Sequence, residues 1–299
     1  MLRYPPTQYP ETDLGLESDD YHGELIADPY RWLETTTDPK TLAWIAAQNS
    51  VTEAVLSGVS RRPRIKAELT ALASYARDSV PFERGGRWFQ FRNSGLQNQP
   101  VLYVMEAPDR PGTVLLDPNA EDPEGTTAVS SAAVSEDGRL LAYAYSVAGS
   151  DWQTWRVRDV ASGKDTEDLV EWSKFSTAAW RKDGSGFYYL APERPPAGEE
   201  YLAQIGQRRV MFHKIGTDQS EDEFVFASPE NSYWHSLARI SEDGRFLIIS
   251  SFNGTAPQAS LRVLDLSDPA AELTTLIDDF DSIADLVCTQ GSTFFLVTD

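Results

Sequence analysis

A polar turn containing glycine, followed at once by a run of apolar and aromatic residues, returns at nearly regular intervals along most of this chain. Three copies read Ser135-Glu136-Asp137-Gly138, Lys182-Asp183-Gly184 and Ser241-Glu242-Asp243-Gly244. Asp-Gly is the turn chemistry of a tight β-hairpin, because glycine adopts positive φ without a Cβ clash. With Gly86 and Gly291 included, the marker glycines are 52, 46, 60 and 47 residues apart. The pattern therefore predicts an antiparallel β-sheet that is repeated along the chain.

Each of the middle hairpins is followed by a further strand that ends in a small polar turn. These strands span residues 154–160, 209–215 and 261–266. One unit is thus about four strands in roughly 50 residues, which is typical of a β-propeller blade. A two-sheet sandwich is the structural alternative. It explains the many strands but not the regular return of the hairpin.

The positions of these units predict how much of a propeller the chain carries. Units begin near residues 80, 130, 175, 233 and 280, and the last has room for about two strands before Asp299. The predicted fold is mainly all-β, an incomplete propeller of about four blades and part of a fifth. An open propeller exposes an apolar sheet face and unpaired strand edges. We therefore expect this chain to be the front part of a longer one.

The N-terminal residues follow a different period and are predicted to be helical. Asp38-Pro39 has the features of a helix start, because Asp can cap free amides and Pro is tolerated at the first helical position. Apolar residues then recur at helical spacing up to Leu56, and Gly58 is expected to end the helix. A second helix is expected from about Pro63.

An aromatic-rich segment, residues 21–34, precedes both helices and is predicted to be irregular, with a proline at position 29. Two short helices and this segment bury too little apolar surface to fold alone. The sequence therefore predicts two parts. Residues 1–77 form a helical arm that docks on another domain, and residues 78–299 form the partial propeller.

Composition and charge exclude several classes of function. The formal net charge of −20 disfavours nucleic acid and anionic membranes as partners, because both would repel the chain. The single cysteine, Cys288, excludes an internal disulfide and a cysteine-based zinc site, and the three histidines show no metal-ligand spacing. No apolar run is long enough to span a bilayer, and Met1–Pro6 contains no signal-peptide core. We expect a cytoplasmic protein without metal or cofactor.

Serine-based acyl transfer needs a nucleophile, a base and an orienting acid. The chain contains no G-x-S-x-G motif. Gly184-Ser185-Gly186 is predicted to lie in a hairpin and Ser150 in a turn between strands, so neither sits on a strand-to-helix turn. His213 and His235 fall on repeat strands without an evident serine partner. We therefore predict no catalytic residue in this chain.

A set of short segments carries a resemblance that runs over essentially all 299 residues. The first is Asp28-Pro29-Tyr30-Arg31-Trp32-Leu33-Glu34, with Gln48-Asn49 after it. The others follow in order: Val80-Pro81-Phe82, residues 93–104, Leu116-Asp117-Pro118-Asn119, Ser135-Glu136-Asp137-Gly138, Gly149-Ser150-Asp151-Trp152, Lys174-Phe175-Ser176 with Trp180, and residues 213–222. In order and spacing these segments resemble the prolyl oligopeptidase family of serine peptidases.

The resemblance implies an architecture and an activity. It implies a helical arm, a seven-bladed propeller and then an α/β-hydrolase domain on which the arm packs. The whole enzyme would cleave short peptides on the carboxyl side of proline, with a Ser/Asp/His triad, an acyl-enzyme and no metal. The hydrolase domain is absent here, so we expect this chain to be inactive alone. The propeller would gate the access of short proline-containing peptides.

The resemblance also nominates substrate-binding residues. Phe175 matches a pocket residue of the family, and an aromatic wall there would confine the apolar part of a peptide. His235, Phe252 and Thr255 align with further family positions, where Met, Arg and Cys are usual. Phe252 cannot pair with a polar group as an arginine would. The preference of the site beyond the proline position is therefore left open.

Two other classes of function remain as alternatives. The first is a stand-alone propeller that serves as a binding module without catalytic activity, which would have no use for the segment Asp28 to Glu34. The second is a propeller hydrolase such as a glycosidase, with carboxylates at the central channel. The acids of the repeats fall mostly in turns, which argues against it.

Overall fold

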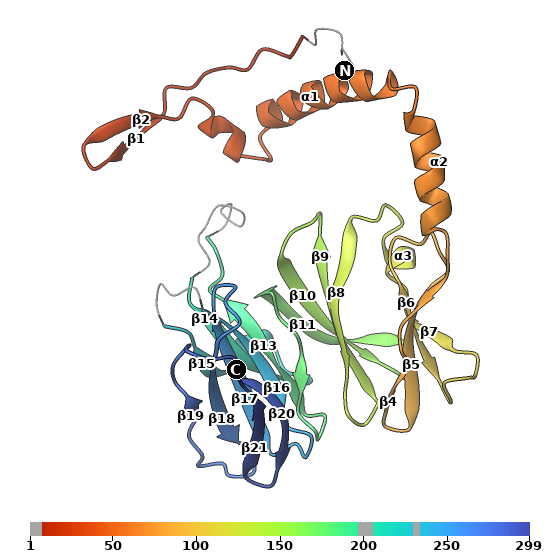
Figure 1. Cartoon of the computed structure of the whole chain (residues 1–299), viewed down its shortest axis with the longest axis vertical. Helices are drawn as coiled ribbons and strands as arrows, with labels where there is room; N and C mark the ends of the chain where they lie inside the picture. Colours follow the sequence, from red (N-terminus) through yellow and green to blue (C-terminus); the bar gives the residue numbers. More distant parts are fainter. Residues whose placement is uncertain (1–7, 197–205, 230–233) are drawn as a thin grey trace. The chain divides into compact units, whose positions relative to one another are not determined.

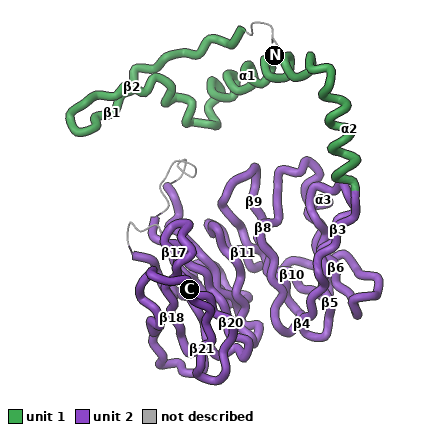
Figure 2. The backbone as a smooth tube through the Cα atoms, viewed as in Figure 1, with its two compact units in different colours: residues 1–74 green, residues 75–299 purple. Residues whose placement is uncertain are grey.

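The computed structural model describes residues 8–196, 206–229 and 234–299. The chain divides into two compact units, residues 1–74 and residues 75–299 (Figure 2). The division lies three residues before the end of the predicted arm at residue 77. The interpretation of Met1–Pro6 falls outside the described residues.

Unit 1 contains the two predicted helices and a hairpin that the sequence did not suggest. The helices are α1 (Pro39–Ser57) and α2 (Arg62–Ala73), and Asp38 caps α1 by accepting a hydrogen bond from the Lys40 amide at 2.7 Å. The prediction that residues 21–34 are irregular is wrong in part. Strands β1 (Ser18–Tyr21) and β2 (Glu24–Ala27) pair as a hairpin, and the short 3-10 helix η1 (Arg31–Glu34) follows.

The helices of unit 1 have no core of their own. Among described residues 8–74, Thr41 alone is buried. The apolar side chains at helical spacing stay exposed: Leu42, Ile45, Leu56, Ile65, Leu69 and Leu72. Most helical stability in proteins comes from tertiary packing of an apolar face. These helices therefore carry an apolar face that the described residues of unit 1 leave uncovered.

The described residues of unit 2 form five antiparallel sheets that follow one another along the chain (Figure 1). The first sheet contains β3 (Arg77–Asp78), β4 (Phe82–Arg84), β5 (Arg87–Asn93), β6 (Val101–Met105) and β7 (Thr113–Leu116). The second contains β8 (Thr127–Val134), β9 (Leu140–Val147), β10 (Trp152–Asp159) and β11 (Lys164–Lys174). The third contains β12 (Ala179–Trp180), β13 (Gly186–Pro192), β14 (Arg208–Lys214) and β15 (Glu223–Ala227). The fourth contains β16 (Trp234–Ile240), β17 (Phe246–Asn253), β18 (Ala259–Asp265) and β19 (Thr274–Ile277), and the fifth contains β20 (Asp285–Gln290) and β21 (Thr293–Val297). The short helices α3 (Pro118–Glu121) and η2 (Gln219–Glu221) lie in connections.

The cores of unit 2 lie between consecutive sheets. Phe89 of the first sheet packs with Leu141 and Tyr143 of the second. The same arrangement joins the second sheet to the third, the third to the fourth and the fourth to the fifth. Sheets stacked in series confirm the predicted propeller architecture and exclude a sandwich, whose two sheets share one core.

The recurring hairpin is closed by its own side chains. In the copy after β8, the Ser135 hydroxyl donates to Asp137 at 2.7 Å and accepts from the Leu140 amide at 3.0 Å. Gly138 has a φ of +69°, and a Cβ there would lie 2.4 Å from the Arg84 carbonyl oxygen. Glycine is therefore required both by the turn and by the close approach of the neighbouring sheet.

Candidate functional site

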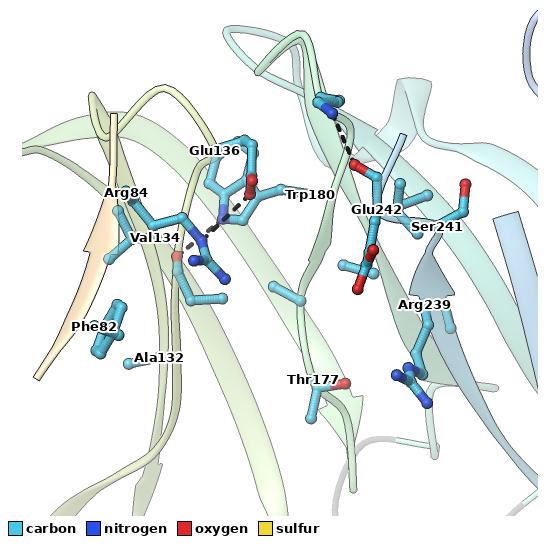
Figure 3. A pocket seen from close by; sticks show the side chains of 16 residues that line it. Phe82, Arg84, Ala132, Val134, Glu136, Thr177, Trp180, Arg239, Ser241 and Glu242 are labelled. Carbon is cyan, nitrogen blue, oxygen red and sulfur yellow. Dashed lines mark hydrogen bonds and ion pairs between the residues drawn. The ribbon is translucent and has the colours of Figure 1, made fainter. Parts of the chain in front are cut away.

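The innermost strands of four sheets surround a common cavity. Residues of β4, β8, β12 and β16 line this central cavity, whose volume is about 500 Å³ (Figure 3). Five of the residues that line the cavity are alanines: Ala132, Ala133, Ala178, Ala179 and Ala238. In four of the sheets a strand at or near the start of the sheet faces the cavity, an arrangement typical of propeller blades.

Charged residues lie along one end of the central cavity, near the hairpin turns. The Arg84 guanidinium pairs with Glu136 at 3.3 Å, and the Lys182 ammonium donates to the Glu242 carbonyl oxygen at 2.7 Å (Figure 3). The Arg84 and Glu136 side chains are both exposed, so their ion pair contributes only about 0–1 kcal/mol. This rim is hydrophilic, and its charges can exchange partners at little cost.

Phe175 lies at the opposite end of the sheets from this rim. It follows the last residue of β11. Antiparallel pairing places that residue at the end of the sheet where β8 begins, whereas the rim lies at the other end of the sheet, where β8 ends. Its side chain is 54 % exposed, and its φ is +53°, in the left-handed region that bulky residues rarely adopt. An exposed aromatic ring on an unusual backbone is a candidate for ligand contact.

Three of the four predicted binding residues come together at this end. Phe175 and His235 line one small pocket, the end pocket, with Lys174, Leu190, Pro192 and Arg208. The His235 and Phe252 rings stack with centroids 5.1 Å apart and 19° between their planes. Phe175 directly follows β11, and the other residues belong to β11, β13, β14, β16 and β17, so only sheet packing brings them together.

Thr255 is placed differently from the other three. It is exposed in the turn after β17 and is not among the described residues that line the end pocket. Thr255 therefore does not share this pocket with Phe175.

The electrostatics of the end pocket favour the neutral form of the His235 imidazole. Burial lowers the pKa of His235, and the nearby Arg208 charge lowers it further. The Arg208 guanidinium donates to the Trp234 carbonyl oxygen at 2.6 Å, and burial lowers its pKa. Sequence reasoning missed Arg208, because nothing local marks the first residue of β14 as part of a site.

His213 is held by carboxylates rather than by a serine. Its Nδ1 lies 2.7 Å from Asp222 Oδ1 and its Nε2 lies 3.2 Å from Asp168 Oδ1, and its side chain is fully buried. Burial lowers the pKa of His213, but the hydrogen bonds to both carboxylates outweigh it and raise the pKa to about 9. Both ring nitrogens are thus engaged in a structural network, which leaves neither free to act as a base.

The serines considered as nucleophiles also have local roles. The Ser185 hydroxyl donates to Asp183 at 2.6 Å inside its hairpin, and the Ser150 hydroxyl accepts from the Trp152 amide at 3.1 Å. Among the residues that the structure describes, no three His, Cys, Asp or Glu side chains converge as metal ligands. In the same part of the chain, no helix has the length and apolar character needed to cross a membrane.

Comparison with known proteins extends this description. The model of the prolyl oligopeptidase N-terminal β-propeller domain matches residues 10–299. The prolyl endopeptidase of Elizabethkingia miricola is 34 % identical over 98 % of this chain and 41 % of that protein. The dual function macrocyclase-peptidase POPB of Galerina marginata is 31 % identical over 100 % of this chain and 45 % of that protein.

A solved structure gives the same relationship. Prolyl oligopeptidase B from Galerina marginata, bound to a 35mer hydrolysis and macrocyclization substrate, matches with a TM-score of 0.82 and 28 % identity. That match covers 99 % of this chain and 45 % of the other. The chain thus spans less than half the length of these relatives.

Proposed function

This chain belongs to the prolyl oligopeptidase family, and we propose that it supplies the arm and propeller of an endopeptidase that hydrolyses short peptides after proline. In this proposal the end pocket contacts the peptide, the propeller gates access, and the catalytic triad belongs to a hydrolase domain outside this chain. The observation that carries the proposal is the meeting of exposed Phe175 with His235 and Phe252 at one end of the sheets.

Peptide contact follows from the chemistry of these rings. A half-exposed phenylalanine offers apolar area that a peptide side chain can cover, and an aromatic ring loses little conformational freedom on binding. The stacked His235 and Phe252 rings extend that surface without adding a carboxylate. We infer a preference for apolar residues near the proline of the substrate.

Gating follows from the dimensions of the central cavity. The cavity has a volume of about 500 Å³ between the four sheets that line it, the size of a small-ligand cavity, and a folded domain is far larger. The exposed rim pairs can rearrange at little cost as an extended peptide passes. We infer that the cavity admits extended peptides and excludes folded proteins, in a protein that we place in the cytoplasm.

The helical arm supports the same assignment. Its exposed apolar side chains, such as Leu69 and Leu72, need a partner surface to become buried. Because the relatives are more than twice as long as the matched region, their remaining residues could include that surface. We propose that the arm packs on the hydrolase domain, which a binding module alone would not require.

The contact claim is tested by protein-observed NMR with a blocked hexapeptide that contains one Gly-Pro pair. We expect weak binding, with Kd on the order of 1 mM because one wall of the site is present, and shifts at Phe175 and His235. Phe175→Ala should weaken binding by about threefold or more, as expected for losing an aromatic contact. Phe224→Ala removes a ring that is 62 % exposed on β15 and should leave binding unchanged. Equal effects of the two substitutions, or none, would contradict the proposal.

A further inference from the structure

The segment that carries Phe175 crosses from the outermost strand of the second sheet to the innermost strand of the third. We name residues 173–178 the crossover. β12 is only two residues long and pairs with Phe187 and Tyr188 of β13. The inner edge of β13 beyond them therefore lacks a strand partner at Leu190, which is 4 % exposed. A buried strand edge needs another source of hydrogen bonds.

Two serines of the crossover supply those bonds. The Leu190 amide donates to the Ser176 hydroxyl at 2.8 Å, and the Ser173 hydroxyl donates to the Leu190 carbonyl oxygen at 2.7 Å. Ser173 is fully buried, and Ser176 is 4 % exposed. Both polar backbone groups of Leu190 are thus satisfied by side chains that flank Phe175 in sequence.

The crossover is also tied back to the second sheet. The Ser176 amide donates to Gln153 Oε1 at 2.7 Å, and Gln153, itself 5 % exposed, donates to the Ser130 hydroxyl at 3.0 Å. The Trp155 indole donates to the Ser173 hydroxyl at 3.0 Å. Both ends of the Phe175 segment are therefore anchored in buried structure on two sheets.

Between the anchors, Phe175 has little freedom to leave its position. Its backbone is left-handed, and the Lys174 ammonium lies 5.4 Å from its ring and 5.0 Å from the Trp152 ring. Asp151 holds that ammonium at 3.6 Å. An exposed ring on a segment anchored at both ends is ordered before a ligand arrives, which reduces the entropy lost on binding.

We propose that Ser173, Ser176 and Gln153 are positioning residues, which fix the crossover so that Phe175 is held ready for the peptide. This inference rests on the proposed contact between Phe175 and substrate. It adds that the affinity for the peptide depends on the buried hydrogen bonds of Ser173, Ser176 and Gln153, which the peptide does not contact.

The test compares Ser176→Ala with Ser135→Ala in the full chain. Ser135 is a matched control, because it is fully buried and its hydroxyl also accepts a strand amide, at the opposite end of the second sheet. Each variant carries 4-fluorophenylalanine at position 175 as a 19F probe of ring mobility. The readouts are thermal stability, 19F relaxation and affinity for the Gly-Pro hexapeptide.

We expect both variants to lose similar thermal stability, since each loses a hydroxyl that accepts from a strand amide and donates one further hydrogen bond, to Asp137 from Ser135 and to the Thr177 carbonyl oxygen from Ser176. Only Ser176→Ala should make the 19F probe mobile and weaken peptide binding, by about two- to tenfold, the range that one net hydrogen bond can cost. An unchanged probe and affinity in Ser176→Ala would overturn the positioning claim, while Phe175→Ala could still weaken binding. If Ser176→Ala does not fold, Ser173→Ala tests the same anchor.

The failures of the two proposals are distinguishable. If Phe175→Ala leaves affinity unchanged, the substrate contact is wrong whatever Ser176→Ala does. If the wild-type chain binds no peptide, the 19F relaxation of Ser176→Ala against Ser135→Ala still decides whether the anchors order the ring.

Discussion

His213 ties two sheets together through one buried cation. It lies on β14 of the third sheet, Asp168 lies on β11 of the second, and Asp222 precedes β15. The Tyr189 hydroxyl donates to Asp222 at 2.6 Å, and the Gly216 amide donates to Asp168 at 2.5 Å. A neutral His213 would leave two buried carboxylates without their counter-charge, which is costly.

The stability of the fold should therefore fall as this histidine loses its proton. The pKa of His213 is about 9 in the fold, against 6.5 for an ordinary histidine. Its contribution is complete below pH 6.5 and is lost as the pH rises through 9, a change on the order of 3 kcal/mol. We expect urea unfolding at pH 6.5 and 9.5 to show this loss. His213→Gln should be less stable at pH 6.5 but nearly flat over the same interval. If the unfolding free energies of the wild type and of His213→Gln changed with pH in parallel, the stabilising role of protonated His213 would be refuted.

At the scale of elements, the tight hairpins differ in how closely they approach the neighbouring sheet. Gly138 and Gly163 both close hairpins with positive φ, but the space around them differs. A Cβ at Gly138 would lie 2.4 Å from the Arg84 carbonyl oxygen, whereas at Gly163 it would meet nothing within 4 Å. In a hairpin that approaches the next sheet, glycine is thus required for two reasons: the positive φ of the turn and the lack of space for a Cβ atom.

Alanine substitution separates the cost of the positive φ from the cost of the clash with the neighbouring sheet. Gly163→Ala should cost about 1–2 kcal/mol, the price of left-handed backbone in a residue with a Cβ. Gly138→Ala should cost clearly more, because the neighbouring sheet must also move. Urea unfolding of both variants checks the difference. Equal losses would show that the contact with Arg84 adds nothing to the demand for glycine.

Local signals explain which elements could be predicted. The Asp38 cap, Pro39 and Gly58 mark α1 within the sequence itself, and the Asp-Gly turns mark the hairpins of unit 2. The hairpin of β1 and β2 was missed because its strands are short and rich in acidic residues, which disfavour strands. Its His22-Gly23 turn, with positive φ at both residues, was the available signal.

The site was less accessible to sequence reasoning than the fold. Phe175 and His235 are 60 residues apart, and their meeting depends on how β13 and β14 pack between them. Their nomination came from the family resemblance, which also nominated Phe252 and Thr255, two residues that are not among those lining the end pocket. No local pattern marks Arg208 or the anchoring role of Ser176. Such roles depend on partners that folding brings together.

At the scale of the whole molecule, we expect this chain to bind a peptide without cleaving it. The described residues bring aromatic rings together at the end pocket, and they engage His213, Ser150 and Ser185 in structural hydrogen bonds. A chain of this kind should contact a proline-containing peptide and leave its bonds intact. Its sheets pack in series, and the end pocket is built by residues of the second, third and fourth sheets together.

The central claim is tested most directly by one ligand-observed NMR series on the purified chain with the blocked Gly-Pro hexapeptide. Magnetisation transferred from protein to peptide reports contact, and the peptide's own signals report its integrity over a day. We expect magnetisation transfer to the peptide and no new product signals. The appearance of cleaved fragments would show that this chain carries its own catalytic machinery, and an absence of transfer would show that its aromatic face does not receive the peptide.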